Sequence, residues 1–414
     1  MRTEHDFLGE MNVPDNVYYG VQTMRAMENF HITGEHLDLD FIQAMAIVKK
    51  AAALANMETG RLDKKIGNAL VQAASEIIDG QWLDQFPVDP IQGGAGTSVN
   101  MNMNEVLCNR ALEIIGKEKG RYDIISPNNH ANMAQSTNDV FPTSIKVCLS
   151  MKGKKLTEAL KELETELDVK ADEFKDVIKM GRTHLQDAVP ITLGQEMGAY
   201  ASAVARGRKR ISRSLEGVHV INMGGTAVGT GLNAEPAYIK AVATKLSMLT
   251  GDIFVTARNL IDMTNNTDIF AEVSGNMKAT ALMLIKMAND FRLMASGPRC
   301  GPQRIEAAGP SARFFHHAGQ SQSGHGRSPR PDVLPDHRQR HGHQPGRRKR
   351  PVRIERHGTG HGLQPLPLHA VFDQRYPRLR QIPAQRRQGQ QRSLPVLGRP
   401  QRRHRHGPLA AHRL

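Results

Sequence analysis

Long apolar runs are missing from this sequence. The longest, residues 279–285, is interrupted by Thr280 and flanked by Lys278 and Lys286. Because a membrane-spanning helix needs about 18 or more apolar residues, we expect no membrane span. Residues 1–6 are polar and lack the apolar core and small-residue cleavage site of a secretory signal, so we expect no export signal either.

Cysteine is scarce as well. Cys108, Cys148 and Cys300 lie too far apart for a metal-binding knuckle, and an odd, sparse set does not make a disulfide framework. This usage fits a reducing compartment, and we expect a cytoplasmic protein. The sequence also lacks the strand, glycine-rich loop and helix pattern of a nucleotide-binding fold.

The net charge of +14 is unevenly distributed along the chain. Residues 302–414 carry +18, and they hold 12 of the 18 histidines and 14 of the 22 prolines, whereas residues 1–301 carry −4. The basic segment has no sustained apolar period, so it cannot bury enough apolar surface to offset the entropy of folding. We expect it to be disordered, and we expect the core to lie in residues 1–301.

Periodic apolar residues predict long helices in this front part. Between residues 156 and 178 they recur in steps of three and four, which make one stripe of an amphipathic helix. The stripe consists of Leu156, Leu160, Leu163, Leu167, Ala171, Phe174 and Ile178. Residues 276–295 have little polar face, which predicts a helix buried in a bundle. Together these patterns favour an all-α, multi-helix bundle that also buries surface between subunits.

Four polar segments that contain glycine or turn-forming residues interrupt the helices. Residues 93–98 could hold an anion on backbone N–H groups, or form a turn capped by Thr97 or Ser98. Residues 135–139, Gln-Ser-Thr-Asn-Asp, offer neutral donors for a carboxylate, but such residues are also usual helix caps.

The other two segments are residues 181–187 and 224–233. In the first, His184 could serve as an acid, a base or an oxyanion partner. The alternative is local, because Thr183 and Gln186 have the spacing of a capping box. The second has too little periodicity for a regular element and is expected to be a loop. Taken singly, each segment is a weak signal of function, and for residues 93–98 and 135–139 the structural explanation is favoured.

In combination, the order and the amino-acid sequences of these segments resemble those of the fumarase/aspartase superfamily, and most closely those of its aspartate ammonia-lyases. Matching phrases lie at residues 4–10, 18–21, 84–89, 97–102, 135–139, 181–187 and 296–301. One departure is Asn129, where the family usually has Asp. The resemblance implies an all-α fold with a small N-terminal lyase domain, residues 1–139, before a central bundle of long helices, residues 140–301. It also implies a homotetramer in which three subunits contribute to each active site.

The reaction implied by the resemblance is the reversible anti elimination of ammonia from L-aspartate to give fumarate, with no metal or organic cofactor. Removing a proton beside a carboxylate creates a dianionic group, which needs several fixed donors. Carried over position by position, the substrate's carboxylates and ammonium would be held by Thr97, Ser136, Thr137 and Asn138. Thr183 and His184 would contact a carboxylate from a neighbouring subunit, with His184 as the catalytic residue.

Members of the family also carry a mobile loop, G-S-S-x-x-P-x-K-x-N, whose second serine is the general base, and the written sequence lacks it. Residues 313–324, back-translated with permitted codons and shifted forward by one base, can give G-S-S-I-M-P-G-K-V-N-P. The same shift applied from Val352 onward can give F-E-L-N-V-M-E-P-V-M, which resembles another sequence motif of the family. Two ordered matches in one frame indicate a frame change near Gly301. We therefore expect residues 302–414 to be out of frame and the chain to be a defective lyase.

Two alternatives stay open at this stage. Class II fumarate hydratases share the fold, although residues 97–102, 135–139 and 187–190 are closer in wording to aspartate ammonia-lyases. Residues 302–414 could instead be a tail that binds nucleic acid or an acidic partner, with residues 347–350 as its best feature. That tail has few aromatic residues for base stacking, and a solvated, disordered charge run explains it better, so we do not favour the second alternative.

Overall fold

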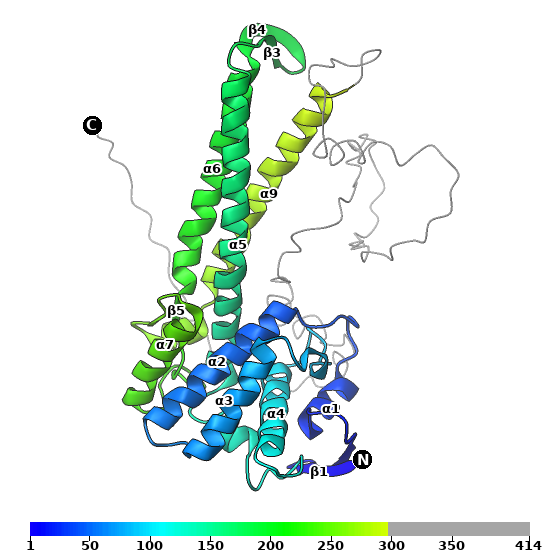
Figure 1. Cartoon of the computed structure of the whole chain (residues 1–414), viewed down its shortest axis with the longest axis vertical. Helices are drawn as coiled ribbons and strands as arrows, with labels where there is room; N and C mark the ends of the chain where they lie inside the picture. The colour runs from blue at the N-terminus through cyan, green and yellow to red at the C-terminus, as the bar shows by residue number, and fades with distance from the viewer. Residues whose placement is uncertain (297–414) are drawn as a thin grey trace, which may run out of the picture.

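The computed structural model describes residues 1–296, and this part of the chain is predominantly α-helical, as predicted (Figure 1). The expected out-of-frame segment, residues 302–414, lies outside the described residues. The helices are α1 Val21–Asn29, α2 Leu39–Glu58, α3 Lys64–Ile78, η1 Leu83–Gln85, α4 Thr97–Ile114, η2 Pro127–Ala131, α5 Thr137–Glu173, α6 Leu193–Val218, α7 Pro236–Thr250, α8 Leu260–Asn265 and α9 Asp268–Met294. The strands form three two-stranded pairs: β1 Arg2–Asp6 with β2 Gly9–Val13, β3 Ile178–Thr183 with β4 Gln186–Thr192, and β5 Val220–Ile221 with β6 Val255–Thr256.

These elements form a rounded lower body and a long helical bundle that rises from it (Figure 1). Helices α1 to α4 and α7 make the lower body, where α2 packs against α3, α5 and α7. Helices α5, α6 and α9 make the bundle, with α6 packed between the other two. The domain division expected after residue 139 falls in the first turn of α5, the helix that runs from the body into the bundle. That turn therefore lies at the junction of the lower body and the bundle.

The first turn of α5 is fixed by its own side chains. Ser136 Oγ accepts a hydrogen bond from Asn138 N at 3.2 Å, and Asp139 Oδ1 accepts one from Ser136 N at 2.9 Å. This reciprocal pairing satisfies donors that a helix start leaves free. Pro142 lies inside the helix and has no N–H for the carbonyl of Asn138. Asn222 Nδ2 donates to that carbonyl instead, at 3.0 Å.

The helix predicted from the stripe at residues 156–178 is confirmed except at its end. Leu160 and Leu167 are buried, and the other stripe members up to Phe174 pack against the core. The prediction is wrong for Ile178, which begins β3 and is 79% exposed. The helix ends before it because Leu193 N and Gly194 N, at the start of α6, donate to the carbonyls of Val177 and Phe174 and turn the chain.

Residues 181–187 form the tip of a β-hairpin, so the capping box considered for Thr183 and Gln186 is wrong. Strands β3 and β4 pair antiparallel up to Thr183 and Gln186, which leaves a two-residue turn. Both turn residues, His184 and Leu185, have positive φ, at 49° and 62°. Two left-handed residues suit the right-handed twist of a hairpin. The capping box nearby is formed by Thr192 and Gln195 at the start of α6.

The start of α4 is set by glycine rather than by a side-chain cap. Neither Thr97 nor Ser98 caps the helix, as the sequence suggested they might; Gly96 occupies the N-cap position with φ +89°, and Thr97 is the first helical residue. A Cβ at Gly96 would overlap the buried ring of Phe141 in α5. Glycine is required here both for its backbone conformation and for this close contact between the two helices.

Substituting Gly96 with Ala should therefore lower the free energy of unfolding by about 3–4 kcal/mol, from left-handed strain plus overpacking. Gly80→Ala is a matched control, because Gly80 has φ +90° and nothing within 4 Å of its added Cβ. It should cost only the strain, about 1–2 kcal/mol. Urea unfolding of both variants measures the difference; equal losses would show that the contact with Phe141 is unimportant.

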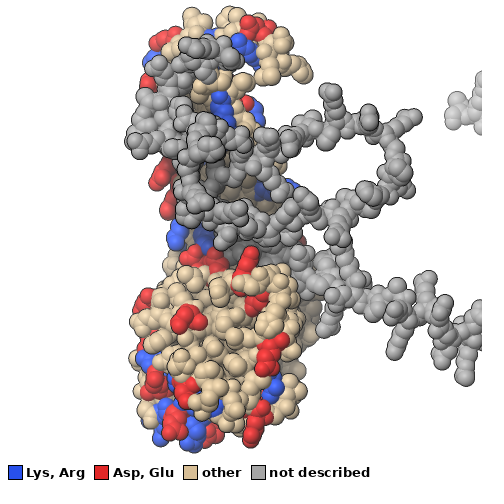
Figure 2. Space-filling view, turned by 90° about the vertical axis from the view of Figure 1, so that its right-hand side faces the viewer, with Lys and Arg blue, Asp and Glu red and all other residues tan. Residues whose placement is uncertain are grey.

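The surface combines charged and apolar regions. Figure 2 shows acidic and basic side chains scattered among uncharged ones over the lower body. Helix α9 was predicted to be buried, but within the described chain only one of its faces is, through residues such as Phe270 and Met287. Leu282 and Ile285 on α9 are 58% and 57% exposed. None of the helices within residues 1–296 is long and apolar enough to cross a membrane.

Candidate active site

The candidate active site lies where the N-termini of α4 and α5 meet. Asn100 Nδ2 in α4 donates to Thr137 Oγ1 in α5 at 3.1 Å. Thr97 lies one turn before Asn100 in the same helix, so it belongs to the same end and side of α4. The fold thereby brings the end of α4 that carries Thr97 to the segment of Ser136, Thr137 and Asn138.

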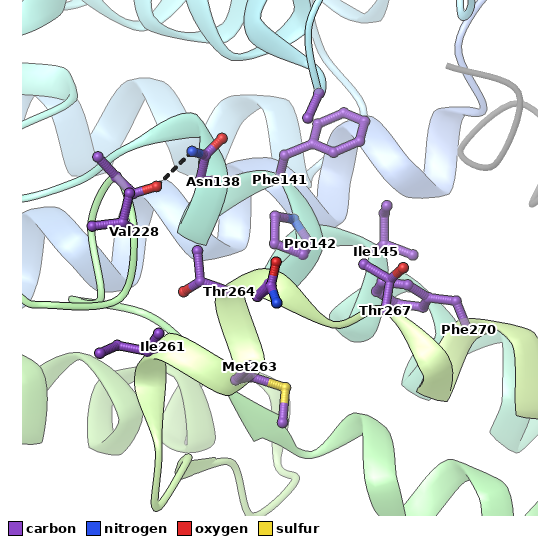
Figure 3. A pocket seen from close by; sticks show the side chains of 13 residues that line it. Asn138, Phe141, Pro142, Ile145, Val228, Ile261, Met263, Thr264, Thr267 and Phe270 are labelled. Atoms are coloured by element: carbon purple, nitrogen blue, oxygen red, sulfur yellow. Dashed lines mark hydrogen bonds between the residues drawn. The ribbon is translucent and has the colours of Figure 1, made fainter. Parts of the chain in front are cut away.

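The hydrogen bonds of these side chains determine which groups remain for a ligand. Thr137 Oγ1 accepts from Asn100, and Ser136 Oγ accepts from Asn138 N, so the proton of each hydroxyl is left to donate. The side chain of Asn138 is exposed, and its Nδ2 donates to the carbonyl of Ala227 at 2.7 Å (Figure 3). Its Oδ1 therefore remains as an acceptor. The segment offers two hydroxyl donors beside one amide acceptor.

The glycine-rich segment 224–233 is a loop, as predicted, and Asp139 holds it against α5. The carboxylate of Asp139 accepts hydrogen bonds from Gly224 N at 3.1 Å and Thr226 N at 3.0 Å. Thr226 is buried and has φ +58°, a strained conformation for a β-branched residue. Burial raises the pKa of Asp139 to about 6, although its hydrogen bonds and the charge of Lys49 oppose the shift.

A cavity of about 400 Å³ opens beside Asn138 (Figure 3). It lies between the start of α5, the loop around Ala227 and the segment that joins α8 to α9. Thr264 and Thr267 give it some polar character, whereas Ile145 and Val228 are apolar. The cavity is large enough for a small organic molecule, and Asn138 is one of the residues that line it.

Lys49 of α2 lies buried beneath the start of α5. Its side chain is 2% exposed, and its Nζ donates to Asn132 Oδ1 at 2.9 Å and to Gln135 Oε1 at 3.0 Å. Burial lowers the pKa of Lys49 to about 7, while the nearby carboxylate of Asp139 opposes this shift. A buried amine that contacts only uncharged acceptors directly is uncommon and costly, so its surroundings must compensate for it.

Thr183 and His184 are not part of this cluster within one chain. Both are exposed at the hairpin turn, at the far end of the bundle from the start of α5 (Figure 1). Helix α5 has 37 residues and is therefore about 55 Å long. A cavity of about 910 Å³ lies under the hairpin, lined by both residues together with Lys179, Arg182 and Asp290. The chain thus carries its predicted site residues in two separate groups.

Several residues of the site were missed by sequence reasoning. Lys49 could have been noticed as a lysine within an apolar stretch of α2, and Asp139 as the last member of segment 135–139. Asn222 and Thr226 carry no comparable signal, because their roles depend on contacts with α5. Across residues 1–296 no three His, Cys, Asp or Glu side chains group to hold a metal ion.

Comparison with known proteins identifies the family. A family model described as lyase matches residues 9–310, most of this chain, which therefore belongs to the lyase family. The chain is 57% identical over 304 residues to the aspartate ammonia-lyase of Bacillus subtilis (strain 168), a match that covers 73% of this chain and 64% of that protein. It is 56% identical over 305 residues to the aspartate ammonia-lyase of a Bacillus species, covering 74% and 65%.

Solved structures of the same superfamily also match this chain. The crystal structure of a fumarate lyase:delta crystallin from Brucella melitensis bound to cobalt matches with a TM-score of 0.72 at 41% identity, covering 77% of this chain and 72% of that one. The predicted membership of the fumarase/aspartase superfamily and the all-α fold are thus confirmed. The chain spans only 64–65% of the length of the two Bacillus relatives.

Proposed function

We propose that this chain derives from an aspartate ammonia-lyase, which eliminates ammonia from L-aspartate to give fumarate in a reversible anti elimination. The observation that carries the proposal is the arrangement of hydrogen-bonding groups at the start of α5. Ser136 and Thr137 each have a hydroxyl proton to donate, and Asn138 has a free Oδ1. Hydroxyl donors suit a carboxylate, and an amide oxygen suits an ammonium group; L-aspartate carries both. The names of the Bacillus relatives support the same reaction.

The chemistry of elimination explains why such an arrangement is useful. When a base removes the proton beside a carboxylate, negative charge accumulates on that carboxylate's oxygens. Donors that are already oriented stabilise this charge without reorganising during the reaction. Thr97, Ser136 and Thr137 are the donors assigned to this role, with Asn138 at the departing ammonium. No metal or organic cofactor enters the proposal.

A second subunit is needed to complete the proposed site. Thr183 and His184 are assigned to a substrate carboxylate, but they lie a helix length of about 55 Å from Asn138 in the same chain. Antiparallel packing of bundles in a homotetramer would bring the hairpin of one subunit to the α5 start of another. The exposed apolar side chains of Leu282 and Ile285 on α9 support such packing. Free, buried Cys108 and Cys148 support a cytoplasmic enzyme.

The proposal also holds that the written chain is a defective form of this enzyme. The family match ends at residue 310, close to the change of composition after Gly301. The base-bearing loop of the family is absent from the written sequence, as are later family segments. Nucleic-acid binding by residues 302–414 is not part of the proposal.

The test uses a fused chain, which joins residues 1–301 to the corresponding C-terminal segment of the Bacillus subtilis relative. Assayed with L-aspartate and L-malate side by side, it should have the higher kcat/KM for L-aspartate. Preference for L-malate would replace the assignment with that of a fumarate hydratase. Discrimination between these substrates depends on a few groups near the departing ammonia or water, which is why the comparison is decisive.

In the same fused chain, His184→Ala should lower kcat/KM for L-aspartate about 100-fold to 1000-fold, the usual effect of removing one donor from a charged transition state. His36→Ala is the matched control, because His36 is also an exposed histidine but lies in the lower body. It should leave kcat/KM unchanged. If His184→Ala also leaves kcat/KM for L-aspartate unchanged, His184 has only a structural role in the hairpin turn.

A further inference from the structure

Lys49 is a buried lysine beside the candidate site, and the elimination chemistry does not use it. It is 2% exposed on α2, and its Nζ joins Asn132, which follows η2, to Gln135, which precedes α5. The charged group that acts on the amine is the carboxylate of Asp139. The contacts of Lys49 therefore converge on the turn that leads into α5.

The amine dictates how the two amide side chains are oriented. The ammonium form of lysine can only donate, and Asn132 and Gln135 both present their oxygens to it. Their amide nitrogens then face backbone carbonyls. Gln135 Nε2 donates to Ala131 O at 3.1 Å and to Met133 O at 3.2 Å, and Asn132 Nδ2 donates to Gln135 O at 3.3 Å. Removing Lys49 would take one hydrogen bond from each amide oxygen and weaken the preference for this orientation.

The turn that these amides hold is under strain. Ala134, at its centre, has φ +59°, a left-handed conformation that costs a residue with a Cβ about 1–2 kcal/mol. Such a conformation persists only where surrounding contacts over-determine it. The hydrogen bonds of Gln135 to the carbonyls on both sides of Asn132 supply that restraint.

The same network reaches a side chain of the proposed site. Asn132 Oδ1, fixed by Lys49, also accepts from Asn100 Nδ2 at 3.2 Å. Asn100 Nδ2 in turn donates to Thr137 Oγ1 at 3.1 Å, which leaves the hydroxyl proton of Thr137 for a ligand. A continuous series of hydrogen bonds thus leads from Lys49 through Asn132 and Asn100 to Thr137.

We propose that Lys49 is a positioning residue, which holds the turn at residues 131–135 and thereby fixes the donors of Ser136 and Thr137. It touches no substrate atom, and it acts through Asn132, Gln135 and Asn100. The part of this inference that concerns substrate rests on the proposed function, whereas the part that concerns the turn does not.

The test is hydrogen–deuterium exchange of the full 414-residue chain. Lys49→Met keeps the aliphatic packing but removes the amine's donors. It should accelerate exchange of the amides of Asp139 and Val140, which donate to Ser136 O, by about 10-fold or more. Peptides from α6 should exchange at the wild-type rate. Lys50→Met, at the part-exposed neighbouring position, should change neither.

Two outcomes would overturn the proposal: unchanged exchange at residues 136–141, or equal acceleration there and in α6, which would mean a general loss of stability. If Lys49→Met does not fold, Gln135→Met keeps Lys49 but removes its acceptor Oε1 together with the Nε2 donor to Ala131 O and Met133 O. It should give at least the same local acceleration; its absence also overturns the proposal.

A measurement of enzyme activity tests the same proposal independently of the exchange experiment. In the fused chain, Lys49→Met should lower kcat/KM for L-aspartate about 10-fold or more, with Lys50→Met unchanged. An inactive fused chain would count against the proposed function, while the exchange result still decides the role of Lys49.

Discussion

The fused chain should form fumarate from L-aspartate at least about 1000-fold faster than the 414-residue chain. A positioned general base contributes about 100-fold to 10,000-fold by itself, and the written sequence lacks the family's base-bearing loop. The C-terminal segment should also cover apolar side chains of α9, such as Leu282 and Ile285, by completing the bundle. Fumarate absorbance in the ultraviolet measures both rates, and gel filtration reports assembly.

The control is the fused chain with the base serine of its loop replaced by Ala. It should assemble like the fused chain yet turn over about as slowly as the written chain, which separates loss of the base from loss of assembly. A soluble 414-residue tetramer with turnover well above background would contradict the idea that the written chain is defective.

Asp139→Ala should lower the free energy of unfolding by about 3–5 kcal/mol. The substitution leaves the N–H groups of Ser136, Gly224 and Thr226 without their acceptor, and each unsatisfied buried donor costs about 1–3 kcal/mol before relaxation. The free energy of unfolding of an ordinary domain is about 5–15 kcal/mol, so a loss of this size removes much of its stability. Chemical denaturation of the wild-type and Asp139→Ala chains measures this difference in the free energy of unfolding.

Asp63→Ala provides the comparison. Asp63 also caps a helix, but it is exposed and its carboxylate accepts only from Lys65 N and Ile66 N of its own helix, α3. Its removal should cost about 1 kcal/mol. Equal losses for the two variants would mean that Asp139 acts only as a cap and that the loop at residues 224–233 is held by other contacts.

Local patterns predicted the elements that depend on near neighbours in sequence. The spacing of Leu160 and Leu167 predicted the buried stripe of α5, and Ser136 with Asp139 start that helix through bonds within four residues. The prediction was wrong at Ile178, where the helix has already ended. The chain turns there because α6 returns along α5, a contact between segments that sequence periodicity does not record.

The prediction of the candidate site was partial for the same reason. The sequence suggested Thr97 and Thr137 separately, but the approach of the two helix starts that carry them depends on the hydrogen bond from Asn100 to Thr137 and on the close contact of Gly96 with Phe141. The resemblance implied that His184 acts from a neighbouring subunit, and its separation from Asn138 within one chain follows from the direction in which α5 leaves the lower body (Figure 1).

The sequence by itself determined the helical class and the family, because hydrophobic period and motif order are local properties of the chain. Only the tertiary structure decided that Lys49 is buried against the turn before α5, and that Asp139 holds Thr226 in a strained conformation. Both contacts join residues about 85 positions apart or more, and their energy depends on burial that no local pattern specifies.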